Sequence, residues 1–232
     1  MIVNHEYRFI FLKTRKTAGT SIEIGLSEFC GPDDIITPIT DVDEEKRRAL
    51  GFRGPQNYDV ARRFYTGIDT ARRYLRRLPK QFANHDTALY VKRNLDPDIW
   101  NTYFKFSFER NPFDKAISRY YWSTKEPRPE ISDYLDTASV HLLSNWDIYT
   151  INDHVGVDFL GRYENLAADL AALTERLRLP GEITMPRAKG GHRSNRKPYQ
   201  EVLDARARER IEIVCAKEIR HLGYAWDAAP PS

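Results

Sequence analysis

The chain has 232 residues, enough for one α/β domain with a substantial core, and its length does not require a second domain. Hydrophobic residues make up 41% of the sequence and charged residues 30%, which excludes a chain that is disordered throughout. The net charge of +3 suits a protein that handles anionic ligands but does not identify nucleic acid as a partner. Cys30 and Cys215 are far apart in the sequence, so neither a disulfide framework nor a metal site is indicated.

The first candidate site lies close to the N-terminus. The apolar segment 7–12 predicts a buried parallel strand, and a helix is expected over 21–29. A strand that enters a glycine-containing loop and then a helix presents backbone N–H groups and the positive end of the helix to an anion. Lys16 adds a positive charge to this loop. Further hydroxyl donors come from Thr17, Thr20 and Ser21.

The next stretch of the chain is less informative. Gly31 and Pro32 end the first helix, and the charged segment 41–50 is expected to be helical. From Tyr58 to Leu78 the apolar residues recur with a helical period, which predicts one helix of about six turns. Six arginines stand between them, at positions 62, 63, 72, 73, 76 and 77. They form either a solvated face or a groove for an acidic ligand, such as a sulfated or uronic polysaccharide.

The second candidate site follows another strand. Residues 104–109 predict a buried strand, and Pro112 is expected to open a helix that runs to about residue 124. Arg110 and Ser118 then lie near the same end of this element, where they are suited to hold a phosphate. A guanidinium at a helix N-terminus is unfavourable unless an anion is also present. The alternatives are an ion pair for Arg110 and a backbone-bonded hydroxyl for Ser118.

The remaining elements alternate between strand and helix. The pattern predicts a strand end and loop over 82–89, a short helix over 96–103, a strand over 157–163, a helix over 165–179, a polar loop over 186–198 and a last helix over 204–221. This alternation predicts an α/β fold in which a central parallel sheet is flanked by helices on both faces, with ligands at the carboxyl ends of the strands. No long apolar stretch is present, and Met1 lies just before the first strand, so we expect a soluble, cytoplasmic protein without a membrane span.

Taken together, the two candidate sites resemble the motifs of the sulfotransferases that use 3′-phosphoadenosine-5′-phosphosulfate (PAPS). The 5′-phosphosulfate loop of that family reads P-K-T-x-G-T-S, and its 3′-phosphate motif reads R-N-P-[YF]-[DE]-R-x-x-S. Segment 16–21, K-T-A-G-T-S, matches the first motif, with Arg15 in place of proline. Segment 110–118, R-N-P-F-D-K-A-I-S, matches the second, with Lys115 in place of arginine. The order and separation of the two motifs make the resemblance specific.

The resemblance implies a P-loop-like single domain over 1–232, in which about 31–80 is a helical insertion and the expected acceptor region. It also implies a basic lid over 186–198, and segment 158–166 looks like the next strand and helix of carbohydrate-type members. The residues expected to bind PAPS are Arg15, Lys16, Thr17, Ala18, Gly19, Thr20, Ser21, Arg110, Ser118, Arg193, Ser194 and Arg196.

The expected catalytic residues are Lys16 and His85. Sulfuryl transfer resembles phosphoryl transfer in needing an in-line acceptor oxygen and compensation of charge on the transferred and leaving groups. In carbohydrate-type relatives a histidine or a glutamate between the two motifs takes the acceptor proton, and His85 is the one histidine in that interval. Asp86 is the alternative base. No metal is expected, because lysine, arginine and backbone amides supply the positive charge.

The sequence therefore predicts a sulfotransferase that moves the sulfuryl group of PAPS to a hydroxyl of a carbohydrate or carbohydrate-bearing acceptor by in-line displacement. One alternative is a nucleotide-dependent kinase, but its phosphate loop requires the order G-x-x-x-x-G-K-[ST], whereas Lys16 precedes Gly19 here. The other alternative is a nucleic-acid-binding module that uses the Arg62–Arg77 helix. We expect a nucleotide donor and a carbohydrate as partners, and no nucleic acid.

Overall fold

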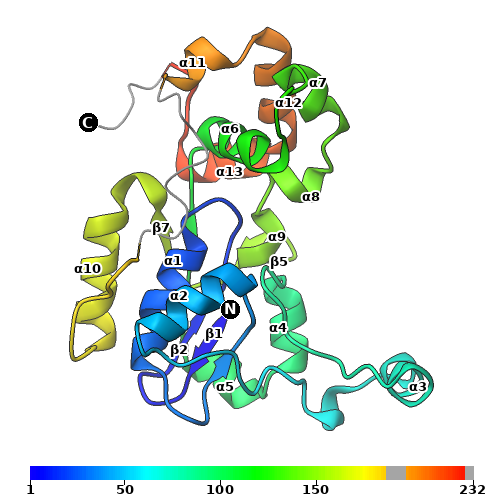
Figure 1. Ribbon diagram of the computed structural model, residues 1–232, viewed down its shortest axis with the longest axis vertical. Coiled ribbons are helices and arrows are strands. Elements are labelled where there is room, and N and C mark those ends of the chain that lie inside the picture. The colour runs from blue at the N-terminus through cyan, green and yellow to red at the C-terminus, as the bar shows by residue number, and fades with distance from the viewer. Residues whose placement is uncertain (187–196, 228–232) are drawn as a thin grey trace.

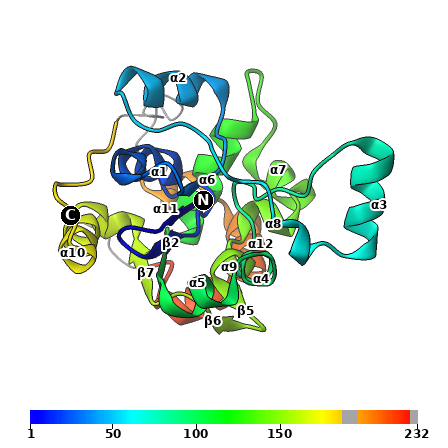
Figure 2. The ribbon, with the colours of Figure 1, turned by 90° about the horizontal axis from the view of Figure 1, so that it is seen from below.

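A computed structural model describes residues 1–186 and 197–227, and it is built around a five-stranded sheet in the order β3-β1-β2-β4-β7 (Figures 1 and 2). The three consecutive strands β2 (Phe9–Phe11), β4 (Phe104–Glu109) and β7 (Phe159–Arg162) are parallel, as predicted. In contrast, β1 (Ile2–Asn4) runs antiparallel to both β2 and β3 (Ile35–Ile36). The sheet is therefore mixed: its three parallel strands fit the predicted parallel sheet, whereas the antiparallel pairing of β1 was not predicted.

A tight turn at the N-terminus accounts for this difference. The side-chain oxygen of Asn4 accepts a hydrogen bond of 2.7 Å from the backbone N–H of Tyr7, and Arg8 has a left-handed φ of 51°. The chain reverses there, so the strand predicted from residue 7 begins at Phe9. β1 is only three residues long, too short for its period to be recognised in the sequence.

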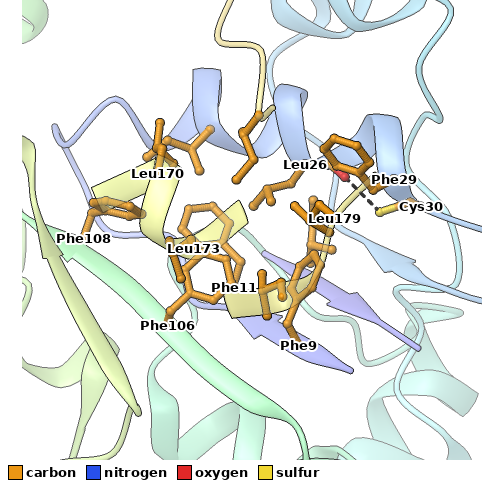
Figure 3. Packing of buried hydrophobic residues seen from close by; sticks show 14 of the residues in the cluster. Phe9, Phe11, Leu26, Phe29, Cys30, Phe106, Phe108, Leu170, Leu173 and Leu179 are labelled. Atoms are coloured by element: carbon orange, nitrogen blue, oxygen red, sulfur yellow. Dashed lines mark hydrogen bonds between the residues drawn. The ribbon is translucent and has the colours of Figure 1, made fainter. Parts of the chain in front are cut away.

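The side chains of the strands pack in two separate clusters. One contains four phenylalanines of β2 and β4 together with α1 (Gly19–Leu26) and α10 (Leu166–Leu177), as Figure 3 shows. The alternate strand residues Val3, Ile10 and Leu12 belong to the other cluster. That cluster also includes residues of α4 (Ala88–Asn94), α5 (Pro97–Thr102) and α9 (Trp146–Tyr149). The period-2 alternation of the strands thus determines which helices each residue meets.

A group of helices lies beside the sheet, at the top of Figure 1, and shares a third buried cluster. It consists of α6 (Pro112–Ser123), α7 (Ile131–Thr137), α8 (Val140–Leu143), α11 (Tyr199–Val202), α12 (Ala205–Val214) and α13 (Ala216–Leu222). The single last helix predicted over 204–221 is interrupted at Cys215, whose ψ of 21° lies outside the helical range. Shorter elements are β5 (Thr150–Ile151), β6 (His154–Val155) and the 3₁₀ turns η1 (Ser27–Phe29) and η3 (Tyr163–Asn165).

The two helices predicted to begin at a proline are confirmed. In α5, Pro97 occupies the first turn, and the carboxylate of Asp96 accepts a 3.0 Å hydrogen bond from Asp98 N–H. In α6, the side chain of Asn111 accepts a 3.0 Å hydrogen bond from Phe113 N–H. Such side-chain caps satisfy N–H groups that have no partner within the helix. By contrast, the strand end and loop expected over 82–89 extend too far, because α4 already begins at Ala88.

The long helix predicted over 58–78 is also wrong. Only α2 (Asp41–Ala49), η2 (Arg62–Phe64) and α3 (Gly67–Arg76) are helical in the region 31–80. Asp59 forms an isolated antiparallel bridge with Gln81, and the N–H of Val60 donates to the carbonyl of Lys80 over 2.9 Å. α3 begins only at Gly67, after the N-cap residue Thr66, which forms a reciprocal capping box with Asp69. In both views α3 projects away from the rest of the chain (Figures 1 and 2).

Candidate active site

The segment 13–18 between β2 and α1 forms the centre of the site, and it is anchored to β4. The hydroxyl of Thr14 donates to the carbonyl of Phe108 and lies 2.8 Å from the hydroxyl of Thr17. Ser107 of β4 donates to the carbonyl of Leu12 over 2.7 Å. Thr14, Thr17 and Ser107 are all buried. These hydroxyls therefore serve to fix the loop on the neighbouring strand, and Thr17 is not an open donor to a ligand as the sequence suggested.

The backbone of this loop is strained in a way that suits an anion. Lys16 and Ala18 have left-handed φ angles of 64° and 58°, which non-glycine residues adopt at a cost. Turns with alternating left-handed residues gather successive backbone N–H groups into a concave nest for anions. Gly19 is required next, because a Cβ there would lie 2.9 Å from Cγ of Lys13 and 3.1 Å from the carbonyl oxygen of Thr14. The loop thus holds its N–H groups at the start of α1.

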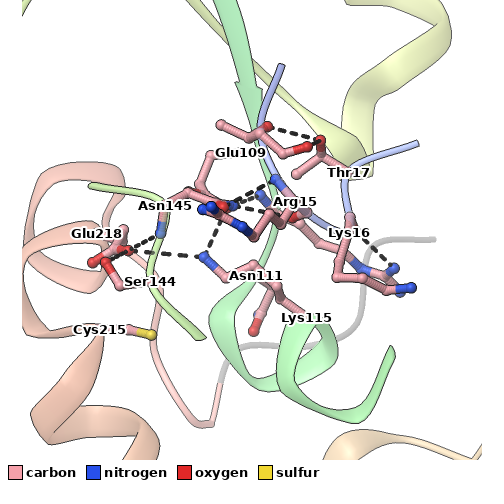
Figure 4. A network of polar contacts seen from close by, with 12 residues as sticks. Arg15, Lys16, Thr17, Glu109, Asn111, Lys115, Ser144, Asn145, Cys215 and Glu218 are labelled. Carbon is pink, nitrogen blue, oxygen red and sulfur yellow. Dashed lines mark hydrogen bonds and ion pairs between the residues drawn. The ribbon is translucent and has the colours of Figure 1, made fainter. Parts of the chain in front are cut away.

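Asn145 explains why arginine can stand where the family motif has proline. Its Oδ1 accepts a 3.0 Å hydrogen bond from the backbone N–H of Arg15, which a proline could not donate. Its Nδ2 donates to the carbonyl of Arg15 and to Oε1 of Glu109, both over 3.1 Å (Figure 4). Asn145 is buried and lies 130 residues after Arg15, so no local pattern in the sequence could have identified it. It thus ties the backbone of Arg15 to Glu109 at the end of β4.

Lys115, which replaces the arginine of the second motif, belongs to the same buried network. Its Nζ lies 2.9 Å from Glu109 Oε1 and 3.8 Å from Glu218 Oε1. Glu218 in turn accepts hydrogen bonds from the hydroxyl of Ser144 and from the backbone N–H of Asn145 (Figure 4). Lys115 is thus directed into the protein, where it compensates two carboxylates and ties α6 to α13.

Arg110 of the second motif contacts the loop of the first motif. Its Nη1 donates to the carbonyl of Lys16 over 3.4 Å, and its guanidinium stacks 4.2 Å from the ring centre of Tyr163. Its Nε is buried and has no hydrogen-bond partner among the described residues. A buried N–H of a charged group without a partner is costly, so this donor indicates a site for an acceptor such as phosphate.

Arg119 is a further basic residue of the site that the sequence interpretation missed. Its guanidinium stacks 4.7 Å from the ring centre of Trp122, and Nζ of Lys16 lies 5.2 Å from the same centre. The pKa of Arg15 is lowered by burial and then by the positive charge of Arg119. Nε of Arg119 is also buried without a partner in the described part of the chain. The sequence signal that could have identified Arg119 is its position directly after Ser118 of the second motif.

The other expected nucleotide contacts fall into two groups. Ser118 is half-buried on α6, while Thr20 and Ser21 lie in the first turn of α1, half-buried and buried respectively. Arg193, Ser194 and Arg196 lie outside the described residues.

His85 is brought to the loop although it is 72 residues away from Lys13 in the sequence. Its Nδ1 lies 2.9 Å from the carbonyl of Lys13, which can only accept, so Nδ1 carries the proton and the lone pair is on Nε2. Burial, with the positive charges of Lys13 and Arg15, lowers its pKa to about 3. The imidazole is therefore neutral at pH 7, and an anion bound at the loop would raise its basicity.

Asp86, the alternative base, has a structural contact of its own. Its carboxylate accepts a 2.8 Å hydrogen bond from the backbone N–H of Ala83, and burial raises its pKa. This contact stabilises the turn that carries His85.

A buried ion cluster that includes Lys13 supports the loop beside Gly19. Nζ of Lys13 lies 2.7 Å from Oε2 of Glu23 and donates to Oδ1 of Asn84 over 3.1 Å. Arg47 of α2 lies 3.7 Å from Oε1 of the same glutamate. Burial alone would raise the pKa of Glu23, but the positive charges, that of Lys13 first, lower it to about 2. The cluster joins α1, α2 and the segment of His85 to one carboxylate.

Within residues 1–186 and 197–227, no group of three or more histidine, cysteine, aspartate or glutamate side chains is placed to hold a metal ion. The same ranges contain no helix long and apolar enough to cross a membrane.

Comparison with known proteins gives two matches. The model of the sulfotransferase family matches residues 1–225. An uncharacterized protein of Archaeoglobus fulgidus is 31% identical over 102 residues, which cover 41% of this chain and 85% of that protein. No solved structure matches the chain.

Proposed function

The chain belongs to the sulfotransferase family, and on that premise we propose that it transfers the sulfuryl group of PAPS to a hydroxyl of a carbohydrate or carbohydrate-bearing acceptor. One observation carries the choice of donor. Four basic residues, Arg15, Lys16, Arg110 and Arg119, converge on a left-handed loop at a helix start, and two of their guanidinium N–H groups are buried without partners in the described residues. Such an arrangement fits a ligand with more than one phosphate-like group.

The residues have separable tasks in this proposal. When bound, PAPS supplies the sulfuryl group, and its nucleotide part is the leaving group. The backbone amides of 15–21 and the ammonium of Lys16 compensate the negative charge that grows on the leaving phosphate. Arg110 and Ser118 hold the 3′-phosphate, with Arg119 as a further cation between the two sites. We assign Arg193, Ser194 and Arg196 of the lid to the same nucleotide.

His85 is proposed to act on the acceptor. Its proton on Nδ1 is engaged by the carbonyl of Lys13, which leaves the lone pair of Nε2 to take the proton of an acceptor hydroxyl. The low pKa favours the neutral, proton-accepting form. Lysine, arginine and backbone N–H groups supply the positive charge, so no metal enters the proposed reaction.

We further propose one domain over 1–232 with a P-loop-like arrangement of helices on both faces of the sheet, an insertion at 31–80 and a lid at 186–198. The two buried clusters on alternate strand residues support the two-faced arrangement. A cytoplasmic location is part of the same proposal. The order of Lys16 before Gly19 continues to argue against a nucleotide-dependent kinase.

The donor can be tested by thermal unfolding in the presence of nucleotides. A ligand at a concentration of about 100 Kd stabilises the folded state by about 2.7 kcal/mol. We expect 3′-phosphoadenosine-5′-phosphate to raise the unfolding temperature more than ADP or ATP at equal concentration. Equal shifts for all three, or a larger shift with ATP, would contradict the proposed donor.

Arg110→Ala provides the matched variant for this test. The affinity for 3′-phosphoadenosine-5′-phosphate should fall by about 10–100-fold, the loss expected for one charge-assisted contact, while AMP binding should change little. Calorimetric titration of both ligands measures this. Screening hydroxyl acceptors with PAPS then identifies the second substrate.

A further inference from the structure

The arm formed by residues 61–80 contains an amphipathic helix whose apolar side faces outward. Ile68, Ala71 and Leu75 of α3 are spaced three and four residues apart, so they form one stripe along the helix, and Leu78 follows directly after it. Ile68 is 67% exposed, Leu75 79% and Leu78 61%. Tyr74, beside this stripe, is 87% exposed. α3 has no buried residue at all.

The opposite, polar side of α3 is the side that contacts the flanking residues of the arm. Asp69 lies 2.7 Å from Nζ of Lys80. Arg73 donates to the hydroxyl of Tyr65 over 3.5 Å, and the same hydroxyl accepts a 2.9 Å hydrogen bond from Lys80 N–H. Tyr65 in turn packs against the cluster that contains Ile10 and Leu12. An amphipathic helix of a globular protein normally buries its apolar stripe, so the orientation of α3 indicates that something else covers it.

The charge of the arm indicates what kind of surface this is. Residues 61–80 contain seven basic side chains and one aspartate, a net charge of +6, whereas the whole chain carries +3, so all other residues together carry −3. Arg72, Arg76 and Arg77 are exposed beside the apolar stripe. Two such arms facing each other would bring like charges together without an apolar area large enough to compensate, so a second copy of this chain is disfavoured.

We propose that the α3 arm docks this protein on the surface of an anionic lipid bilayer. A short helix with an apolar stripe, an aromatic side chain at its edge and arginines beside it matches a helix that lies in the membrane interface. The arginine stems cover apolar surface while their charged ends reach lipid phosphates. Nucleic acid or an acidic polysaccharide would neutralise the arginines but leave the aliphatic stripe in water. The proposal does not depend on sulfuryl transfer.

The test is co-sedimentation of the full chain with vesicles of phosphatidylcholine alone and of an equimolar mixture with phosphatidylglycerol, at low and high salt. We expect binding to the mixed vesicles, little binding to phosphatidylcholine, and a loss of affinity with salt. Leu75→Asp should reduce binding by at least about 10-fold, since it removes the apolar contact and adds a negative charge. Arg76→Ala should reduce it by about 5-fold, the equivalent of about 1 kcal/mol per basic residue near such a surface.

Matched controls lie on α12 and α13, away from the arm in Figure 1. Ile213 is 65% exposed, so Ile213→Asp repeats the same chemical change elsewhere, and Arg220→Ala removes an exposed arginine. Both controls should bind mixed vesicles as the unaltered protein does, and all variants should keep its circular dichroism spectrum and unfolding temperature. No binding to anionic vesicles, or equal losses in variants and controls, would overturn the proposal. A dimer in light scattering that Leu75→Asp dissolves would overturn it too, by assigning the stripe to a second copy.

Discussion

The loop over 13–18 and the α3 arm depart from ordinary packing in opposite ways. The loop carries left-handed residues and buried charges. It is held by β4 and Asn145, which are distant in sequence, and by the ion cluster of Glu23. The arm exposes its apolar side, and its helix is fixed by its own cap and by the flanking Tyr65 and Lys80. The loop is therefore preorganised by the whole fold, whereas the arm is locally determined and available to bind another surface.

Removal of the half-buried charge of Lys16 should give the largest effect. Lys16→Ala should lower the rate of sulfuryl transfer by about 10³-fold, because in the proposed mechanism the ammonium of Lys16 compensates the charge that develops on the leaving phosphate. Lys16→Arg should recover part of this rate. The measurement is the initial rate with PAPS and an identified acceptor. A folded Lys16→Ala protein with normal turnover would remove the lysine from the proposed mechanism.

Substitution in the buried ion cluster of Glu23 should lower the free energy of unfolding more than substitution in the α3 arm. Lys13→Met leaves Glu23 buried with less compensation and should lower the free energy of unfolding by about 3 kcal/mol, measured with urea at pH 7. Lys217→Met removes the exposed ion pair with Asp153 and serves as the control, with an expected loss below about 1 kcal/mol. Equal losses would mean that the buried cluster contributes no more than a surface pair.

The pH dependence of the same cluster has a definite sign. Glu23 has a pKa of about 2 in the folded protein against 4.5 ordinarily, so its stabilising contribution is complete above pH 4.5 and is lost as the pH falls toward 2. A Glu23→Gln variant should therefore lose less stability on acidification over that interval than the unaltered protein does.

The sequence predicted the loop and the second motif well because their signals are local. The strand over 104–109 and the start of α6 at Pro112 are both observed as predicted, since a continuous apolar run and a proline are strong short-range signals. Asn145 and the direction of β1 depend on contacts between distant segments, which no local pattern contains. In the arm, apolar periodicity predicted a long helix, but the cap at Thr66 delays its start.

His85 connects the two regions, because it follows the arm in sequence and contacts the loop in space. His85→Asn should lower the turnover rate by about 100-fold through loss of the proton acceptor, with little change in the affinity for 3′-phosphoadenosine-5′-phosphate. Asparagine is chosen because it tolerates the left-handed φ of 66° at this position. Asp86→Asn is the matched control. Should Asp86→Asn lose more turnover than His85→Asn, the carboxylate would be the base.

The smallest effect is expected at the cap of α3. Thr66→Ala removes the side-chain acceptor for Asp69 N–H and should cost about 1 kcal/mol of local helix stability. Because α3 buries no residue, this loss should appear as about 5-fold faster hydrogen exchange of its amides, while the urea midpoint of the whole protein stays unchanged. Thr87→Ala, which removes the equivalent cap of α4, should lower that midpoint, since Ala88 and Val91 are buried in the core. If Thr66→Ala also lowered the midpoint, the arm would have to be part of the cooperative core, and the contrast between a locally determined arm and a globally determined loop would not hold.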